Sequence, residues 1–256
     1  MKTSNNYFFS DMSVMLGRSM RHILRSMDTI ITVTITPIVM MLLFVYVLGG
    51  AIQAGTDNYV NYLLPGMLLI SIASGTAYIA YRLFMDMQRG IFERFSSMPI
   101  ARSSALWGHV LTALVSNAIS VIVIILVALI MGFRSSAGIL SWLSVAGILA
   151  LFTLALTWLA VIAGLSAKSV DGAGAFSYPL IFLPFISSAF VPTESMPTVV
   201  RIFAENQPVT SIVNTIRALL SESPIENEIW VALAWCLITL VITYLFAIRI
   251  YKRKVG

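Results

Sequence analysis

Charge is the property that this sequence has least of. Only 11% of its 256 residues are charged and 59% are hydrophobic, whereas an average soluble domain is about 25% charged and about 45–50% apolar. The mean hydropathy of +0.92 agrees. This composition excludes an ordinary soluble enzyme and indicates a polytopic membrane protein. No polar stretch is long enough for a second domain, so we expect a single transmembrane domain over residues 1–256.

The residue types that build common catalytic and metal sites are also scarce. The chain has one cysteine, Cys236, and two histidines, His22 and His109, which lack a second ligand at metal spacing. None of its four lysines follows a glycine, so the Walker A pattern is missing. The patterns HExxH, GxSxG and CxxC are missing as well. We therefore expect no catalytic residues, no metal site and no nucleotide site on this chain.

Ionisable groups are missing from the middle of every apolar run. Proton relays and ion sites place such groups there, at a cost of roughly 2.5–3.5 kcal/mol each. The polar groups in the runs are small hydroxyls and Asn117, which are more typical of helix–helix contacts than of substrate binding. This pattern disfavours a self-powered carrier, so the energy for any pumping must come from outside the chain.

Apolar runs, by contrast, are plentiful. A membrane helix needs about 20 apolar residues to cross ~30 Å of hydrocarbon, and six runs qualify: residues 30–48, 62–81, 105–133, 139–167, 174–191 and 229–250. The sequence thus predicts an all-α membrane protein with six transmembrane helices. Pro179 and Pro184 interrupt the short fifth run, and Pro65 and Gly66 lie in the second. These positions are either hinges or static kinks.

Positive charge predicts the orientation of these helices. If the N-terminus is cytoplasmic, thirteen of the sixteen Lys and Arg residues fall on the inner side. The outer segments keep only Arg134, Arg201 and Arg217. We therefore expect a multi-pass protein of the bacterial plasma membrane. By the positive-inside rule, both of its termini face the cytoplasm.

Two amphipathic segments lie on the predicted inner side. In residues 5–27 an apolar stripe at helical spacing runs beside Arg18, Arg21 and Arg25, which is typical of a helix lying in the membrane interface or docked on a partner. Residues 84–98 form a second amphipathic helix that Pro99 ends. This helix is either a docking surface or a charged inner loop that only obeys the positive-inside rule.

The longest predicted outer loop, residues 192–228, contains two apolar clusters. One covers residues 199–203, and the other forms a helical stripe over residues 209–220. Both are too short to span a membrane. They either dip back toward the bilayer or lie as amphipathic helices on the outer surface.

Four stretches, in this order, resemble a known family. They are YLLPGMLLI at residues 62–70, GIFERFSSMPIARS at 90–103, FISSAFVPTESMP at 185–197 and FAENQPVTSIVNTIRALL at 203–220. Together with the N-terminal helix and six spans, they are similar to the type-2 permeases of ATP-binding cassette (ABC) exporters, which include the daunorubicin-resistance-type permeases. The resemblance covers nearly the whole chain.

This resemblance implies a fold like that of type V ABC exporters, with an N-terminal connecting helix, a cytoplasmic coupling helix and short outer re-entrant helices. It implies a homodimer, or a heterodimer with a related permease, that pairs with two copies of a cytoplasmic ATPase. ATP and Mg would bind to that partner, and no cofactor to this chain. Membrane lipids are the other expected partner, and nucleic acid is not one.

The resemblance also implies roles for particular residues. Coupling to the ATPase is expected at Gly90, Phe92, Glu93, Arg94, Phe95 and Pro99. The connecting helix would use Arg18, Arg21 and Arg25. The substrate pathway, lined mainly by spans two and five, would include Met67, Ile70, Ser74, Tyr78, Phe182, Phe185 and Ser188. The outer gate would include Pro192, Met196, Pro197 and Arg217.

The function expected from sequence is therefore that of an exporter permease powered by a separate ATPase. The apolar spans suit a hydrophobic or amphipathic cargo that is drug-like, lipid-like or lipid-linked. The alternative is a non-transporting anchor, sensor or immunity subunit of an ABC-type complex. A channel or secondary carrier is a third possibility.

Overall fold

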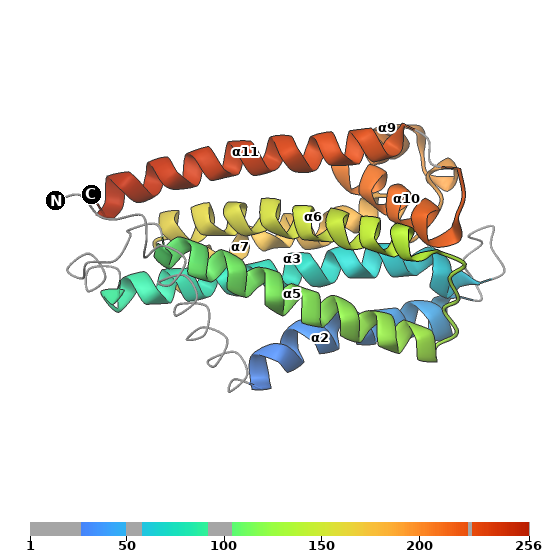
Figure 1. The fold of residues 1–256 in the computed structure, drawn as a ribbon, viewed down its shortest axis with the longest axis horizontal. Helices are drawn as coiled ribbons and strands as arrows, with labels where there is room; N and C mark the ends of the chain where they lie inside the picture. Colours follow the sequence, from blue (N-terminus) through green and yellow to red (C-terminus); the bar gives the residue numbers. More distant parts are fainter. Residues whose placement is uncertain (1–26, 50–57, 92–103, 225–226, 256) are drawn as a thin grey trace.

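The fold consists of helices that run along one long axis. The computed structural model describes residues 27–49, 58–91, 104–224 and 227–255, and all regular structure in these ranges is helical. Figure 1 shows the helices lying side by side, with the C-terminus at one end of the bundle and α9 and α10 at the other. The predicted all-α class is confirmed for these residues.

Four helices are long and apolar enough to cross a membrane: α3 (Tyr59–Gln88), α5 (Ser104–Ile130), α6 (Ile139–Ser166) and α11 (Glu228–Val255). The shortest has 27 residues, which at about 1.5 Å per residue exceeds the ~30 Å hydrocarbon layer. They correspond to the predicted spans two, three, four and six.

The first and fifth predicted spans form shorter or interrupted helices. The first is α2 (Met27–Leu42) followed by a π-helical stretch, η2 (Leu43–Leu48). The fifth is divided into α7 (Val170–Ala175), α8 (Ser177–Phe182) and a 3₁₀ turn, η3 (Leu183–Ile186). Pro184 lies in the first turn of η3, where its ring and missing N–H favour a break in the α-helix. The six-span arrangement therefore remains a prediction for these two segments.

Helix α3 is longer than the sequence analysis predicted. Residues 84–88, expected to begin a separate cytoplasmic helix over 84–98, instead form the end of α3. No glycine or proline lies between Gly75 and Gly90, and Gly90 takes a φ of 65° in the turn that follows α3. The rest of that predicted helix, from residue 92, lies outside the described residues, as does nearly all of the predicted connecting helix over residues 5–27.

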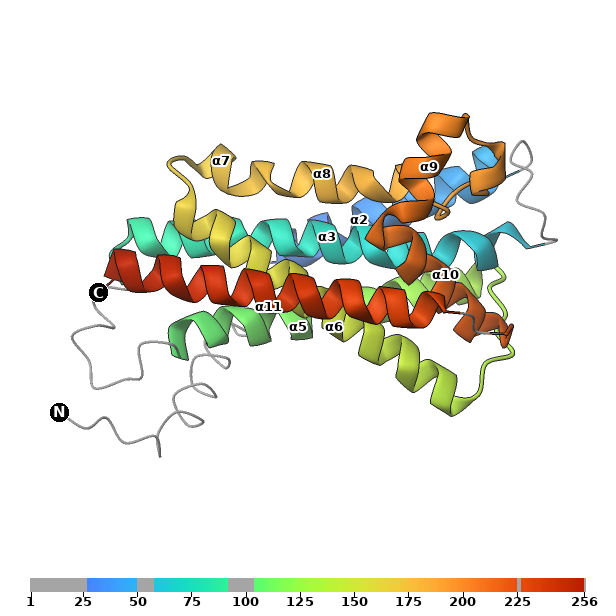
Figure 2. The same ribbon diagram turned by 90° about the horizontal axis from the view of Figure 1, so that it is seen from above.

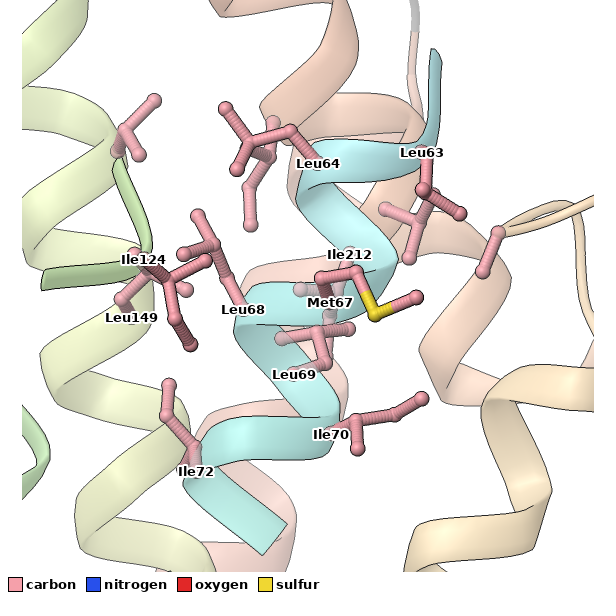
Figure 3. Close-up of a cluster of buried hydrophobic side chains, with 14 of the residues drawn as sticks. Leu63, Leu64, Met67, Leu68, Leu69, Ile70, Ile72, Ile124, Leu149 and Ile212 are labelled. Atoms are coloured by element: carbon pink, nitrogen blue, oxygen red, sulfur yellow. The ribbon is translucent and has the colours of Figure 1, made fainter. Parts of the chain in front are cut away.

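The core is built around α3, which contacts α2, α5, α6, α7, α8 and α10. In its first half the buried side chains leave the helix on several sides: Leu68 and Ile72 point toward Ile124 and Leu149, whereas Ile70 points away from them (Figure 3). A second cluster, at the end nearer the C-terminus, includes Leu83 and Trp158. α3 is thus the central helix, and both clusters bind it to its neighbours.

The segment after η3 covers one end of the bundle (Figure 2). It contains a short turn, η4 (Thr193–Ser195), and two helices, α9 (Thr198–Asn206) and α10 (Pro208–Ser221). The apolar stripe of α10 is buried against α3, α6 and α11. The larger apolar side chains of α9 remain exposed, Val199 to 82%, and only Ala204 is buried. The two apolar clusters of the 192–228 loop therefore differ, one packed into the bundle and the other on its surface.

Gly66 allows α3 to approach the segment after η3 closely. A Cβ at this position would lie 2.6 Å from the Cβ of Ala189, which is too close for two methyl groups. We expect Gly66→Ala to lower the free energy of unfolding by about 1–2 kcal/mol, because overpacking outweighs the gain in helix propensity. Thermal unfolding of the purified chain in detergent measures this.

The matched control is Gly147→Ala in α6, where a Cβ meets nothing within 4 Å. This change should leave stability equal or slightly higher. A double variant, Gly66→Ala with Ala189→Gly, should recover most of the loss. Equal melting temperatures for the Gly66→Ala and Gly147→Ala chains would contradict the contact.

Candidate functional site

Arg217 of α10 lies at the centre of a polar cluster at the end of the bundle opposite the C-terminus. Its Nη2 donates to the main-chain carbonyls of Tyr62 at 3.1 Å and Ser188 at 2.8 Å. Its guanidinium carbon lies 3.8 Å from the centroid of the Tyr62 ring, a cation–π contact. One side chain thus joins α10 to the start of α3 and to the segment after η3.

Asn214, one turn earlier in α10, extends this cluster to α11. Its Oδ1 accepts from Arg217 Nη1 at 3.0 Å and from Ser188 Oγ at 2.6 Å, and its Nδ2 donates to Glu228 Oε1 at 2.9 Å. We call Tyr62, Ser188, Asn214, Arg217 and Glu228 the Arg217 cluster. Its bonds connect four parts of the chain that are far apart in sequence.

The positively charged guanidinium of Arg217 is largely shielded from water. Burial lowers the pKa of the Arg217 guanidinium, but arginine stays protonated in proteins. Charge-assisted hydrogen bonds are the stronger kind, so separating these four segments would break several strong bonds at once. In this structure the cluster therefore holds the four segments together at this end of the bundle.

The other predicted outer-gate residues lie in a neighbouring turn. Pro192 accepts from Ser195 through its main-chain carbonyl, and Met196 and Pro197 lead directly into α9. This turn is joined to α9 by Thr193 Oγ1, which donates to Glu205 Oε1 at 3.3 Å. The structure therefore brings Arg217, but not these three residues, into the cluster.

Glu205 also binds Arg201 on the surface of α9. The two side chains form an i,i+4 pair with 2.7 Å between Arg201 Nε and Glu205 Oε1, and this hydrogen bond raises the pKa of Arg201. Arg201, which the sequence analysis placed on the outer side, therefore has a carboxylate partner.

The predicted pathway residues differ in their accessibility. Met67 and Ile70 are buried in the core around α3, and Ser188 belongs to the Arg217 cluster. Phe185 stacks on Phe190, with ring centroids 4.7 Å apart. Ser74 and Tyr78 are half-buried, and Phe182 is 62% exposed. Of these residues only Phe182 is exposed on the surface of the chain, and the pathway itself remains a prediction.

At the end of the bundle near the C-terminus, a polar side-chain contact joins α3 to α5. His109 Nε2 lies 3.3 Å from Asp86 Oδ2, and both side chains are largely buried. These two residues stand on either side of the 89–103 segment, which leaves α3 through Gly90. The pair therefore joins α3 and α5 close to where that segment leaves each helix.

Several predicted site residues cannot be placed. Phe92, Glu93, Arg94, Phe95 and Pro99, together with Arg18, Arg21 and Arg25, lie outside the described residues. Their assignment to coupling and connecting helices stays a prediction.

Sequence reasoning missed two contacts. It expected His109 to lie at the membrane interface or in a helix–helix contact but named no partner for it, although Asp86 and His109 lie near the ends of α3 and α5 that flank residues 89–103. It also gave no partners for Arg217. The presence of Arg217 in an otherwise apolar helical stripe was the available signal, because a charge near a buried face needs bonding partners.

Comparison with known proteins adds independent information. A family model described as ABC-2 type transporter matches residues 10–221. The chain is 26% identical over 195 residues to daunorubicin resistance ABC transporter permease protein DrrB1 of Streptomyces coeruleorubidus, covering 75% of this chain and 68% of that protein. It is 25% identical over 215 residues to probable doxorubicin resistance ABC transporter permease protein DrrC of Mycobacterium tuberculosis, covering 82% and 77%.

A third relative has a different name. Nodulation protein J of Bradyrhizobium diazoefficiens is 27% identical over 211 residues, which cover 77% of this chain and 75% of that protein. The family match includes both the 89–103 segment and Arg217.

Proposed function

Because this chain belongs to the ABC-2 type transporter family and is a membrane permease subunit of an ABC exporter, we propose that it moves a hydrophobic or amphipathic cargo out of the cell. The family match carries this proposal. The missing Walker A pattern supports the view that ATP, with Mg, is bound and hydrolysed by a separate cytoplasmic subunit. The cargo class is drug-like or lipid-like, by analogy with two relatives named for resistance to daunorubicin and doxorubicin.

In the proposed assembly, two copies of this chain, or one copy and a related permease, bind two ATPase subunits through residues 89–103 and the N-terminal segment. The distribution of Lys and Arg supports cytoplasmic termini. The Arg217 cluster would then lie on the outer side. Exposed apolar side chains on α2, α8 and α11 would face lipid or the second permease.

Helix α3 is the element that would transmit the movement. Its 30 residues begin at Tyr59, just before Tyr62 of the Arg217 cluster, and end at Gln88, next to the 89–103 segment. Closure of the ATPases on ATP would displace the 89–103 segment and, through it, the ends of α3 and α5. The outer end would then open by breaking the bonds of Arg217, a switch between two packed arrangements.

The Asp86–His109 contact would make the ends of α3 and α5 move together when the 89–103 segment is displaced. We expect Asp86→Ala or His109→Ala to lower the amount of cargo moved per ATP by about fivefold, the population shift that a pair worth ~1 kcal/mol produces. The swap Asp86→His with His109→Asp should restore most of it. Cargo transport and ATP hydrolysis are measured together in proteoliposomes.

Lys168→Ala is the control for this prediction, because Lys168 is an exposed residue of the same predicted side that lies outside α3 and α5. Its ratio of cargo to ATP should not change. If the swap is as defective as the single changes, the contact does not act as a positioning pair.

The proposed function is tested by copurifying the chain with its candidate ATPase and measuring ATP turnover with added ligands, daunorubicin first. We expect a stable complex whose turnover rises with a ligand that the complex then transports. A complex that binds but moves no cargo would instead identify an anchor or sensor subunit. Transport without nucleotide would identify a channel or secondary carrier.

A further inference from the structure

A pocket of about 570 Å³ lies beside the Arg217 cluster. It is lined by residues at the start of α3, just past the end of α5 and on α10, including Asn61, Tyr62, Arg134, Arg217 and Ser221. Two hydrogen bonds join Asn61 to the main chain of Arg134. Asn61 Nδ2 donates to the Arg134 carbonyl at 2.8 Å, and the Arg134 N–H donates to Asn61 Oδ1 at 3.1 Å. The wall is therefore built by specific bonds between segments distant in sequence.

The pocket concentrates positive charge. Arg134 and Arg217 are two of only three Lys or Arg residues in the predicted outer segments, and both line it. Arg134 Nη1 donates to the carbonyls of Leu129 and Phe133, at 3.2 and 2.8 Å. Within the described ranges, neither guanidinium lies within salt-bridge distance of a carboxylate, whereas Arg201, outside the pocket, has Glu205.

Two described carboxylates near the pocket accept hydrogen bonds from neutral groups and bond to neither arginine, although the charge of Glu228 attracts Arg217. Glu222 Oε1 accepts from the Gly138 N–H, and Glu228 Oε1 accepts from Asn214 Nδ2, both at 2.9 Å. Two guanidinium groups in one concave site raise the local potential and favour an anion. Their planar sets of donors match the oxygens of a phosphate.

The pocket also lies at the depth where lipid headgroups are found. It is next to the ends of three membrane helices: α3 begins at Tyr59, α5 ends at Ile130 and α6 begins at Ile139. Tyr59, Tyr62 and Trp142 lie at the same ends, and such residues are enriched at the boundary between membrane and water. An anion that is always present at this depth is the phosphate of a membrane lipid.

We propose that this pocket binds the phosphate of an anionic lipid headgroup through Arg134 and Arg217. The bound phosphate accepts hydrogen bonds from both guanidinium groups, neither of which forms a salt bridge among the described residues. Because Arg217 also holds α10 to α3, lipid binding stabilises the closed arrangement of this end of the bundle.

The test uses the purified full chain in detergent with phosphatidylglycerol, with zwitterionic phosphatidylcholine and with inorganic phosphate. Native mass spectrometry counts bound lipid, and thermal unfolding measures stabilisation by each probe. We expect phosphatidylglycerol to bind at least tenfold more tightly than phosphatidylcholine. Arg134→Gln and Arg217→Gln should each weaken that binding about tenfold, the loss of one charge-assisted contact.

Arg201→Gln is the matched control, since it removes an outer arginine that already has a carboxylate partner, and its lipid binding should be unchanged. Arg134→Lys keeps the charge and should keep binding within about threefold, which separates loss of the site from loss of the fold. If inorganic phosphate alone binds with the same dependence on Arg134 and Arg217, the anion site is supported, with its ligand drawn from solution.

Equal phosphatidylglycerol binding by the wild type and all three glutamine variants would overturn the proposal. So would equal binding of phosphatidylglycerol and phosphatidylcholine in the absence of any effect of phosphate. Neither result bears on whether the chain transports cargo with an ATPase, so the proposed function stands or falls separately.

Discussion

Glu93→Arg is expected to reduce ATP-driven transport to the background level while the chain still inserts in the membrane. Glu93 is the only acidic residue in the 89–102 stretch, which also contains Arg89, Arg94 and Arg102. If this stretch binds the ATPase as proposed, reversing its single negative charge removes an attraction and adds a repulsion in the contact that delivers the energy. Phe92→Asp should act similarly, by placing a charge in an apolar contact.

The measurement combines vesicle transport with copurification of the ATPase. Asp171→Arg is the control: it makes the same charge reversal at an exposed position that the Lys and Arg distribution also places on the inner side. It should retain most transport. Unchanged ATPase association and cargo efflux in the Glu93→Arg chain would show that the coupling site lies elsewhere.

Arg217→Met is expected to loosen the outer end of the bundle. It removes three hydrogen bonds from a charged donor and leaves the carbonyl of Ser188 and the side chain of Asn214 short of partners. Hydrogen bonds to charged groups contribute about 1.5–3 kcal/mol each and do not add fully, so a loss of about 2–4 kcal/mol in unfolding free energy follows. In the assembled exporter, ATP hydrolysis should continue with less cargo moved per ATP.

Arg217→Lys should recover only part of this loss, because an ammonium group cannot reproduce the fork of donors that reaches three acceptors. Arg201→Met, which breaks an exposed pair on α9, should change neither melting temperature nor transport noticeably. Equal melting temperatures for the Arg217→Met and Arg201→Met chains would show that the Arg217 cluster does not stabilise this end of the bundle.

The long helices could be predicted from sequence because the membrane imposes a simple rule on them. About 20 apolar residues are needed to cross, and the runs that became α5, α6 and α11 have clear ends. The interruption of the fifth run was also predictable, since Pro184 removes a donor and favours a break where η3 forms. Helical periodicity likewise predicted α10, whose stripe is buried.

The extent of α3 and the contacts between distant residues could not be predicted in this way. Residues 84–88 have a period that fits equally well a separate helix or the end of α3, and only packing decides. Arg217 and Tyr62 are 155 positions apart, a separation on which local patterns carry no information. Asn117 was expected to join helices; it does pack against Gly75, yet its amide has no hydrogen-bond partner within the described segments.

The central claim is that energy enters this protein only from a separate ATPase, through the segment between α3 and α5. Reconstituting the purified chain in proteoliposomes, with and without the ATPase, tests it most directly when cargo movement against its concentration gradient is followed. We expect accumulation only when the ATPase and ATP are both present, and none with an imposed proton or sodium gradient. Uphill movement of cargo by the chain alone would contradict the claim.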